Sequence, residues 1–132
     1  MNIDARAFTV DCTGDAVTGD TVLFEEMVWG GSYRRPTPIG KRRIAARIIK
    51  DSYGAAKQQH TFTLEVIASD GTCALTPGTK TTRKGRNIYR NGTRRMVWDD
   101  EAARDIVAEE KHHRGDFARA IREQRRAAEI WY

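Results

Sequence analysis

Seven Lys or Arg side chains and no acid fall within residues 79–98, the stretch TKTTRKGRNIYRNGTRRMVW. A protein that neutralises phosphates releases the counterions condensed around a nucleic acid, and this release supplies most of the non-specific affinity. An arginine can also hold one phosphate through two parallel hydrogen bonds. We therefore predict that this stretch binds the phosphate backbone of DNA or RNA.

A second basic run precedes this stretch. Residues 31–98 carry +12, whereas residues 1–30 carry −5 and residues 99–132 carry −2, which gives the net charge of +5. The strong positive charge of residues 31–98 favours a polyanionic partner. The alternative is that these cations are solvated, or pair with the acids of the N-terminal segment and of the C-terminal helix. The second run comprises Arg34, Arg35, Lys41, Arg42, Arg43 and Arg47.

The residues predicted to contact nucleic acid come from both runs. Tyr89 is the best candidate for stacking on an unpaired base, and Tyr33, Tyr53 and Trp98 also lie among the cations. In the alternative interpretation, Tyr89 and Trp98 belong to the core. The predicted contacts are Arg43, Arg47, Lys84, Arg86, Tyr89, Arg90, Arg94 and Arg95.

Residues 79–98 are predicted to form a β-hairpin. Asn91-Gly92 separates two short runs of β-forming residues, and both central positions of a type I′ turn need positive φ, which Asn and Gly tolerate. A two-residue loop would pair Arg90 with Thr93 and Ile88 with Arg95. The cations would then decorate a two-stranded surface.

Three further strands are predicted from alternating apolar positions. They cover residues 21–29, 41–50 and 60–71, with a helix as the rival for residues 41–50. The Gly- and Pro-rich segment GGSYRRPTPIG, residues 30–40, is predicted to be a loop. The inward-facing residues are Val22, Phe24, Val28, Ile44, Ala46, Ile48, Phe62, Leu64 and Val66.

The pattern becomes helical from Asp99 onwards, where an Asp is available to cap a helix and further acids occupy the first turn. Gly115-Asp116 would end that helix and begin a second, although a single bent helix is an alternative. The helical segment would pack over the β-domain, or dock on a partner protein or a second copy of the chain. Its predicted partner-binding anchor is Ile130, Trp131 and Tyr132.

The stretch TGDTVLF, residues 18–24, resembles the first strand of SH3-like small barrels, including KOW-type modules. The resemblance agrees with a mainly β (α+β) fold. We predict a small SH3-like or related β-barrel of about five strands with a C-terminal helical extension. Residues 1–132 would form a single domain, with the barrel core in residues 1–98 and the helix or helix pair in residues 99–132 packed on it.

Two other stretches, DSYGAAKQQHTFTLEV and KGRNIYRNGTRR, resemble small uncharacterised proteins encoded by phages of actinobacteria. The second functional hypothesis is a phage-encoded interaction protein that binds and modulates a host protein. The basic face would then meet an acidic surface of the partner.

No motif for catalysis, a cofactor or a metal stands out. We find no Gly-rich phosphate loop, paired-carboxylate motif or nucleophile elbow, so a nuclease-like enzyme using His60 with Asp51 is the third and weakest hypothesis. His112 and His113 follow Glu109 and Glu110, but a solvated helix face explains them better than a metal site.

Two further features concern the compartment. The two cysteines, Cys12 and Cys73, are far apart, and we interpret them as small core residues of a reduced protein. No apolar run is long enough to cross a bilayer, and the N-terminal residues lack a signal-peptide pattern. These features predict a cytoplasmic protein without membrane contact, in the host cell if it is phage-encoded.

Overall fold

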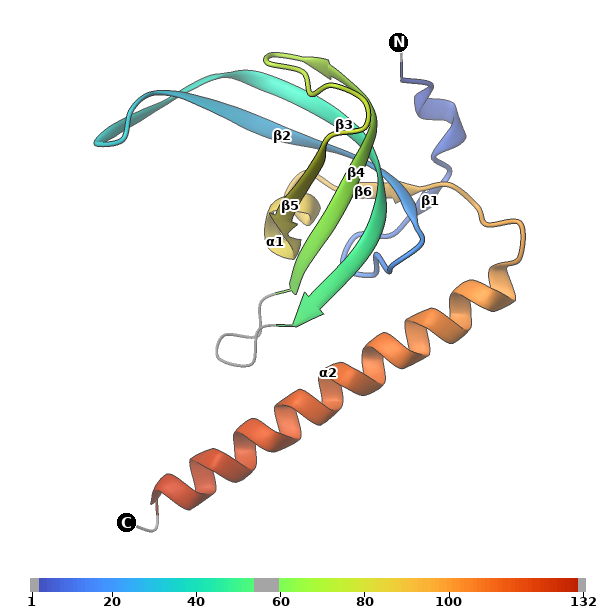
Figure 1. Cartoon of the computed structure of the whole chain (residues 1–132), viewed down its shortest axis with the longest axis vertical. Helices are drawn as coiled ribbons and strands as arrows, with labels where there is room; N and C mark the ends of the chain where they lie inside the picture. The colour runs from blue at the N-terminus through green and yellow to red at the C-terminus, as the bar shows by residue number, and fades with distance from the viewer. Residues whose placement is uncertain (1–2, 54–59, 131–132) are drawn as a thin grey trace.

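Six antiparallel strands form one strongly curved sheet in a computed structural model that describes residues 3–53 and 60–130 (Figure 1). Their order across the sheet is β1-β6-β2-β3-β4-β5, and the helices are η1, α1 and α2. The bounds are η1 Ala5–Ala7, β1 Val10–Asp11, β2 Thr21–Ser32, β3 Arg35–Tyr53, β4 His60–Gly71, β5 Lys80–Lys84, α1 Gly85–Tyr89, β6 Thr93–Arg95 and α2 Glu101–Ile130.

This architecture confirms the mainly β fold with a C-terminal helix. Among the described residues the sheet has six strands rather than about five, and it stays open, because β1 and β5 lie at opposite ends of the pairing order. An open edge invites pairing with another chain, and lysines at the strand ends discourage it. The edge strand β5 begins at Lys80 and ends at Lys84.

The concave face of the sheet holds the main core. All nine residues predicted to face inward are buried, which confirms the alternation in β2, β3 and β4. Phe62, Ile44, Ile48 and Leu64 are fully buried, and each such side chain contributes about 1.5–3 kcal/mol of hydrophobic stabilisation. Strand β4 has the predicted bounds, residues 60–71.

The predicted hairpin at Asn91-Gly92 is wrong. Strand β5 pairs with β4, whereas β6 pairs with β2 and β1 at the other end of the sheet, and α1 connects them. The reason lies in Ile88, which is fully buried in the core and draws residues 85–89 across the concave face as a helical turn. Gly92 does have positive φ, at 86°, but its N–H donates to the Tyr89 carbonyl and ends this helix.

The predicted loop at residues 30–40 is also wrong, because these residues continue β2 and β3. Ser32 pairs with Arg35 across the two-residue turn Tyr33-Arg34. Beyond Phe24, β2 pairs only with β3, and before Arg42, β3 pairs only with β2. Residues 25–32 and 35–41 therefore form a two-stranded ribbon, called the ribbon below, which projects from the sheet (Figure 1).

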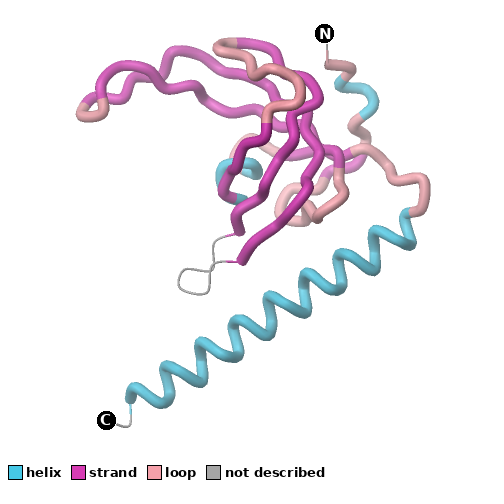
Figure 2. Tube along the Cα trace, viewed as in Figure 1, coloured by secondary structure: helices cyan, strands magenta, loops and turns pink. Residues whose placement is uncertain are grey.

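Helix α2 is a single helix of 30 residues without the predicted break at Gly115 (Figure 2). The N–H groups of Ala102 and Ala103 are bonded to the Asp100 carboxylate, at 3.0 Å and 3.4 Å, so the predicted Asp cap is confirmed. Gly115 is buried within this helix. Neither this helix nor the other described helices are long and apolar enough to span a membrane.

The two cysteines are free thiols in different surroundings, and this makes a simple prediction. Cys12 is buried, and burial raises the pKa of its thiol to about 12, whereas Cys73 is exposed. Because the thiolate is the reactive form, we expect an aromatic disulfide reagent at pH 8 to titrate one thiol per native chain and two in denaturant. Two fast-reacting thiols in the native protein would contradict the placement of Cys12.

Candidate nucleic-acid interface

A carboxylate lies where the alternation of β2 calls for an apolar side chain. Glu26 follows Val22 and Phe24 on the concave face and accepts hydrogen bonds from two arginines. Arg42 Nε lies 2.7 Å from Glu26 Oε1, and Arg83 Nε lies 2.8 Å from Glu26 Oε2. Burial alone would raise the pKa of Glu26, but hydrogen bonds from Arg83 and Arg42 outweigh it and leave the pKa below its usual value.

This triad lines a hollow with a volume of about 650 Å³. We call this hollow the ribbon groove, because the base of the ribbon forms one wall and α1 forms the other. Four cations and one carboxylate line it, which gives a net charge of +3. Its lining residues are Glu26, Met27, Val28, Trp29, Lys41, Arg42, Arg83, Asn87, Arg90 and Asn91.

The groove's other two cations are open to solvent. Arg90 follows α1 and is exposed. The Lys41 side chain is 62% exposed and has a weak ion pair with Glu25, with 3.7 Å between Nζ and Oε1. Beyond the groove, the exposed turn of the ribbon adds Arg34 and Arg35. The ribbon therefore carries positive charge both at its base, beside the groove, and at its tip.

Two of the predicted contacts are engaged inside the protein. Arg95 is buried and holds Glu101 through two hydrogen bonds of 2.9 Å and 2.7 Å. The Tyr89 hydroxyl accepts the N–H of Ala16 at 3.0 Å, its ring meets Phe62 edge-on, and burial raises the pKa of Tyr89 to about 12. These residues stabilise the fold, which is the alternative that the sequence left open for Tyr89.

The other predicted contacts are dispersed over the molecule. Arg43 makes a two-bond ion pair with Asp70, at 3.0 Å and 2.5 Å, and Arg94 donates to the carbonyls of Phe8 and Thr9. Only Arg90 of the predicted set lines the groove. Three more are exposed elsewhere: Arg47 on β3, Lys84 at the end of β5 and Arg86 in α1.

Trp29 is the groove residue that the sequence interpretation missed. Trp29 is 56% exposed, and the sequence pattern placed it at the end of the predicted strand 21–29, just before the predicted loop at residues 30–40. A signal was present in Pro36 and Pro38, two residues apart, because proline at alternate positions suits an unpaired strand edge. The partner-binding prediction remains open: Ile130 is the last residue of α2, and Trp131 and Tyr132 lie outside the described residues.

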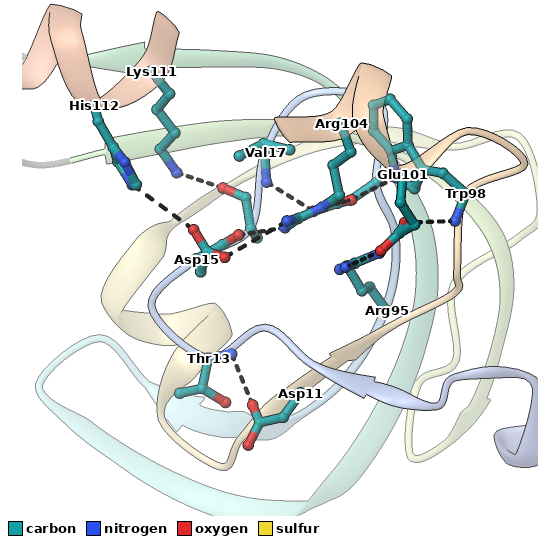
Figure 3. A network of polar contacts seen from close by, with 12 residues as sticks. Asp11, Thr13, Asp15, Val17, Arg95, Trp98, Glu101, Arg104, Lys111 and His112 are labelled. Carbon is teal, nitrogen blue, oxygen red and sulfur yellow. Dashed lines mark hydrogen bonds and ion pairs between the residues drawn. The ribbon is translucent and has the colours of Figure 1, made fainter. Parts of the chain in front are cut away.

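Helix α2 is fastened to the sheet by long polar side chains rather than by an apolar stripe (Figure 3). Asp20 is fully buried and lies 2.8 Å and 3.0 Å from Arg104 Nε and Nη2. The same carboxylate accepts the Trp98 indole N–H at 2.7 Å and the Val17 N–H at 2.9 Å. Four donors thus satisfy one buried carboxylate, and three separate segments meet there.

Two Thr-Gly-Asp turns, at residues 13–15 and 18–20, explain this arrangement. Gly19 has φ of +97°, and a Cβ there would come within 2.8 Å of the Trp98 ring, so only glycine fits before Asp20. The first turn supplies Asp15, whose carbonyl accepts from Arg104 at 2.6 Å. Lys111 completes the attachment by donating to the Ala16 carbonyl.

A pH prediction follows from Glu101, at the start of α2. Hydrogen bonds from Arg95 and from the Trp98 N–H lower the pKa of Glu101 from 4.5 to about 2. A carboxylate whose pKa is lowered by folding stabilises the fold above its ordinary pKa, and this contribution is lost as pH falls from 4.5 towards about 2. We expect Glu101→Gln to lower the melting temperature at pH 7 but hardly at pH 2. A difference that is independent of pH would contradict the role of this ion pair.

His60 and Asp51 do lie together, as the acid–base hypothesis requires. They line a hollow of about 140 Å³ with Lys111 and Arg114, and Arg114 lies 3.0 Å from Asp51. Burial, with the charge of Lys111, lowers the pKa of His60, and burial also lowers the pKa of Lys111. Within residues 3–53 and 60–130, no three His, Cys, Asp or Glu side chains are grouped as a metal site would need.

Comparison with known proteins places the sheet in a family. Residues 12–98 match DUF7699, a domain of unknown function, and the chain belongs to this family. The match runs from Cys12 to Trp98, so it contains the whole ribbon groove and ends before α2.

A rice protein (Oryza sativa subsp. japonica) named zinc finger CCCH domain-containing protein 62 is 42% identical over 124 residues. The alignment covers 90% of this chain and 18% of that protein, so the chain spans about a fifth of its relative's length. This chain has two cysteines, one fewer than a CCCH zinc site needs, so the similarity does not rest on a complete finger here. No solved structure matches the chain.

Proposed function

We propose that this domain binds nucleic acid, without catalysing a reaction on it, through the ribbon groove and the cationic ribbon tip. The observation that supports the proposal is the convergence of four cations and an exposed tryptophan on one hollow with a net charge of +3. Phosphates supply the negative charge that such a surface lacks, and an aromatic ring supplies a platform for a base.

The groove is preorganised for this task. Glu26 fixes the guanidinium groups of Arg42 and Arg83, which line the groove on either side of its carboxylate. Side chains that are already ordered lose less conformational entropy when a ligand binds. Lys41 and Arg90 are exposed, so their side chains can adjust to the phosphates of a nucleic acid whose path through the groove varies.

The competing explanation, a solvated basic surface, fits the opposite face of the sheet better. There Arg43 is neutralised by Asp70 in a two-bond pair. Four cations and one carboxylate line the groove, and Lys41 has only a weak, exposed pair with Glu25 at 3.7 Å, so positive charge is left for a ligand. Mutual repulsion among these cations costs stability, and a bound polyanion would relieve it.

The test is fluorescence anisotropy of labelled single-stranded RNA, single-stranded DNA and duplex DNA with the whole chain. We expect the logarithm of the binding constant to fall linearly with the logarithm of the salt concentration between about 50 mM and about 200 mM, because phosphate contacts release counterions. Absence of binding to all three probes at the lowest salt would overturn the proposal.

A second candidate function is binding of a protein partner through the exposed part of α2. Phe117 is 66% exposed and Ile106 is 59% exposed on this helix. Large exposed apolar side chains are typical of interaction surfaces when they cluster. Binding of this kind would survive salt and would be insensitive to substitutions in the ribbon groove, which separates it from the first proposal.

A further inference from the structure

We propose that the ribbon groove takes a single strand and that one unpaired base stacks on Trp29. This inference rests on the function proposed above and adds the class of ligand. It follows from three features of the groove: the exposed indole, two amide side chains on the opposite wall, and a size that suits a nucleotide rather than a duplex.

The indole of Trp29 is unusually available for a large aromatic side chain. More than half of its surface, 56%, is exposed, whereas Trp98 is partly buried and bonded to Asp20. An aromatic ring beside a cationic track binds unpaired bases by stacking, because every base has a π-face. In a duplex those faces are already stacked on neighbouring base pairs.

The wall opposite the ribbon carries groups that can meet a base edge. Asn87, in α1, and Asn91, just after it, both line the groove. The Asn91 side-chain N–H donates to the Glu25 carbonyl at 3.2 Å, and this fixes the amide. The oxygen of the same amide is an acceptor, which suits the amino group of a base. Such contacts would favour bases whose edges are unpaired.

The position of the charge argues against a duplex. A two-stranded ribbon can enter the major groove of DNA, which is about 12 Å wide, but the ribbon's own tip would then carry the contacts. Arg34 and Arg35 lie at that tip, but four further cations come from β3, β5 and the end of α1 and line a hollow beside the ribbon. Its volume, about 650 Å³, falls in the range of about 300–1,000 Å³ that is typical of small-ligand pockets.

The experiment compares the wild-type chain with Trp29→Ala and Trp29→Phe on three probes of equal length. The probes are a labelled single strand, the same strand without bases (an abasic backbone), and a blunt duplex. We expect Trp29→Ala to lose about tenfold in affinity for the single strand, with an unchanged salt slope, because stacking but no phosphate contact is removed. Trp29→Phe should recover most of the loss, and both variants should bind the abasic strand as the wild type does.

Two results would overturn the inference. One is tighter binding of the duplex than of the single strand by the wild type, which would place the ribbon in a major groove. The other is an equal loss on the normal and the abasic strand in Trp29→Ala, which would show that Trp29 only supports the ribbon. In either case the cationic groove still binds nucleic acid. Absence of binding to every probe would instead overturn the proposed function, and this inference with it.

Discussion

Asp20→Ala is expected to destabilise the protein by about 3–5 kcal/mol, the typical cost of removing one partner from a buried ion pair. The substitution leaves the buried Arg104 guanidinium without its carboxylate, and it removes the acceptor of the Trp98 indole and of the Val17 N–H. Marginal stabilities of about 5–15 kcal/mol mean that such a loss could leave little folded protein. Urea unfolding, followed by circular dichroism, measures the change.

Asp15→Ala is the matched control for this prediction. Asp15 also lies near Arg104, at 3.6 Å between its Oδ2 and Nη1, but its side chain is 51% exposed. Exposed ion pairs contribute about 0–1 kcal/mol, so we expect a small change. Equal losses in the two variants would show that α2 is held by general charge attraction and not by the buried carboxylate.

Replacing the four exposed cations of the ribbon and groove is expected to weaken nucleic-acid binding on the order of 10²-fold near 0.1 M salt. The variant is Arg34→Gln, Arg35→Gln, Lys41→Gln and Arg90→Gln together. For every phosphate of a single strand that is no longer neutralised, the log–log salt slope should become shallower by about 0.7. Arg42 and Arg83 stay in place, because their removal would leave Glu26 buried without partners.

A second quadruple variant separates the groove from net charge. Replacing Lys50, Lys80, Arg125 and Arg126 by Gln removes four exposed cations outside the groove. Both variants lower the net charge from +5 to +1. We expect this control variant to retain nearly all of the wild-type affinity and most of the wild-type salt slope. Equal weakening in the two variants would mean that binding follows overall charge and has no defined site.

Much of the fold could be predicted, because the core strands alternate clearly. In β4, every second residue from Phe62 to Val66 is buried, as its pattern predicts. The ribbon could not be recognised in this way, since residues 29–39 are all exposed or half-buried and glycine and proline obscured the strand. The hairpin prediction failed for a different reason. Asn-Gly suits both a hairpin turn and the end of a helix, and the burial of Ile88 in the core favours the helix here.

The candidate site could be predicted only as a region of positive charge. Sequence shows how many cations a segment carries, but not which of them meet a carboxylate distant in the chain. Arg83 meets Glu26, 57 residues away, and Arg104 meets Asp20, 84 residues away. Arg43 and Arg95 looked as available as Arg90 and are not, because Asp70 and Glu101 bind them.

The most direct test of the ribbon groove is an amide NMR titration of the isotope-labelled chain with a short single-stranded oligonucleotide at low salt. We expect the chemical-shift changes to concentrate at the groove and the ribbon tip, in residues 26–29, 34–35, 41–42, 83 and 87–91. The amide signals around Asp70 and along α2 should not shift. Changes centred on Arg43 and Arg47, or on α2, would contradict the groove as the binding site.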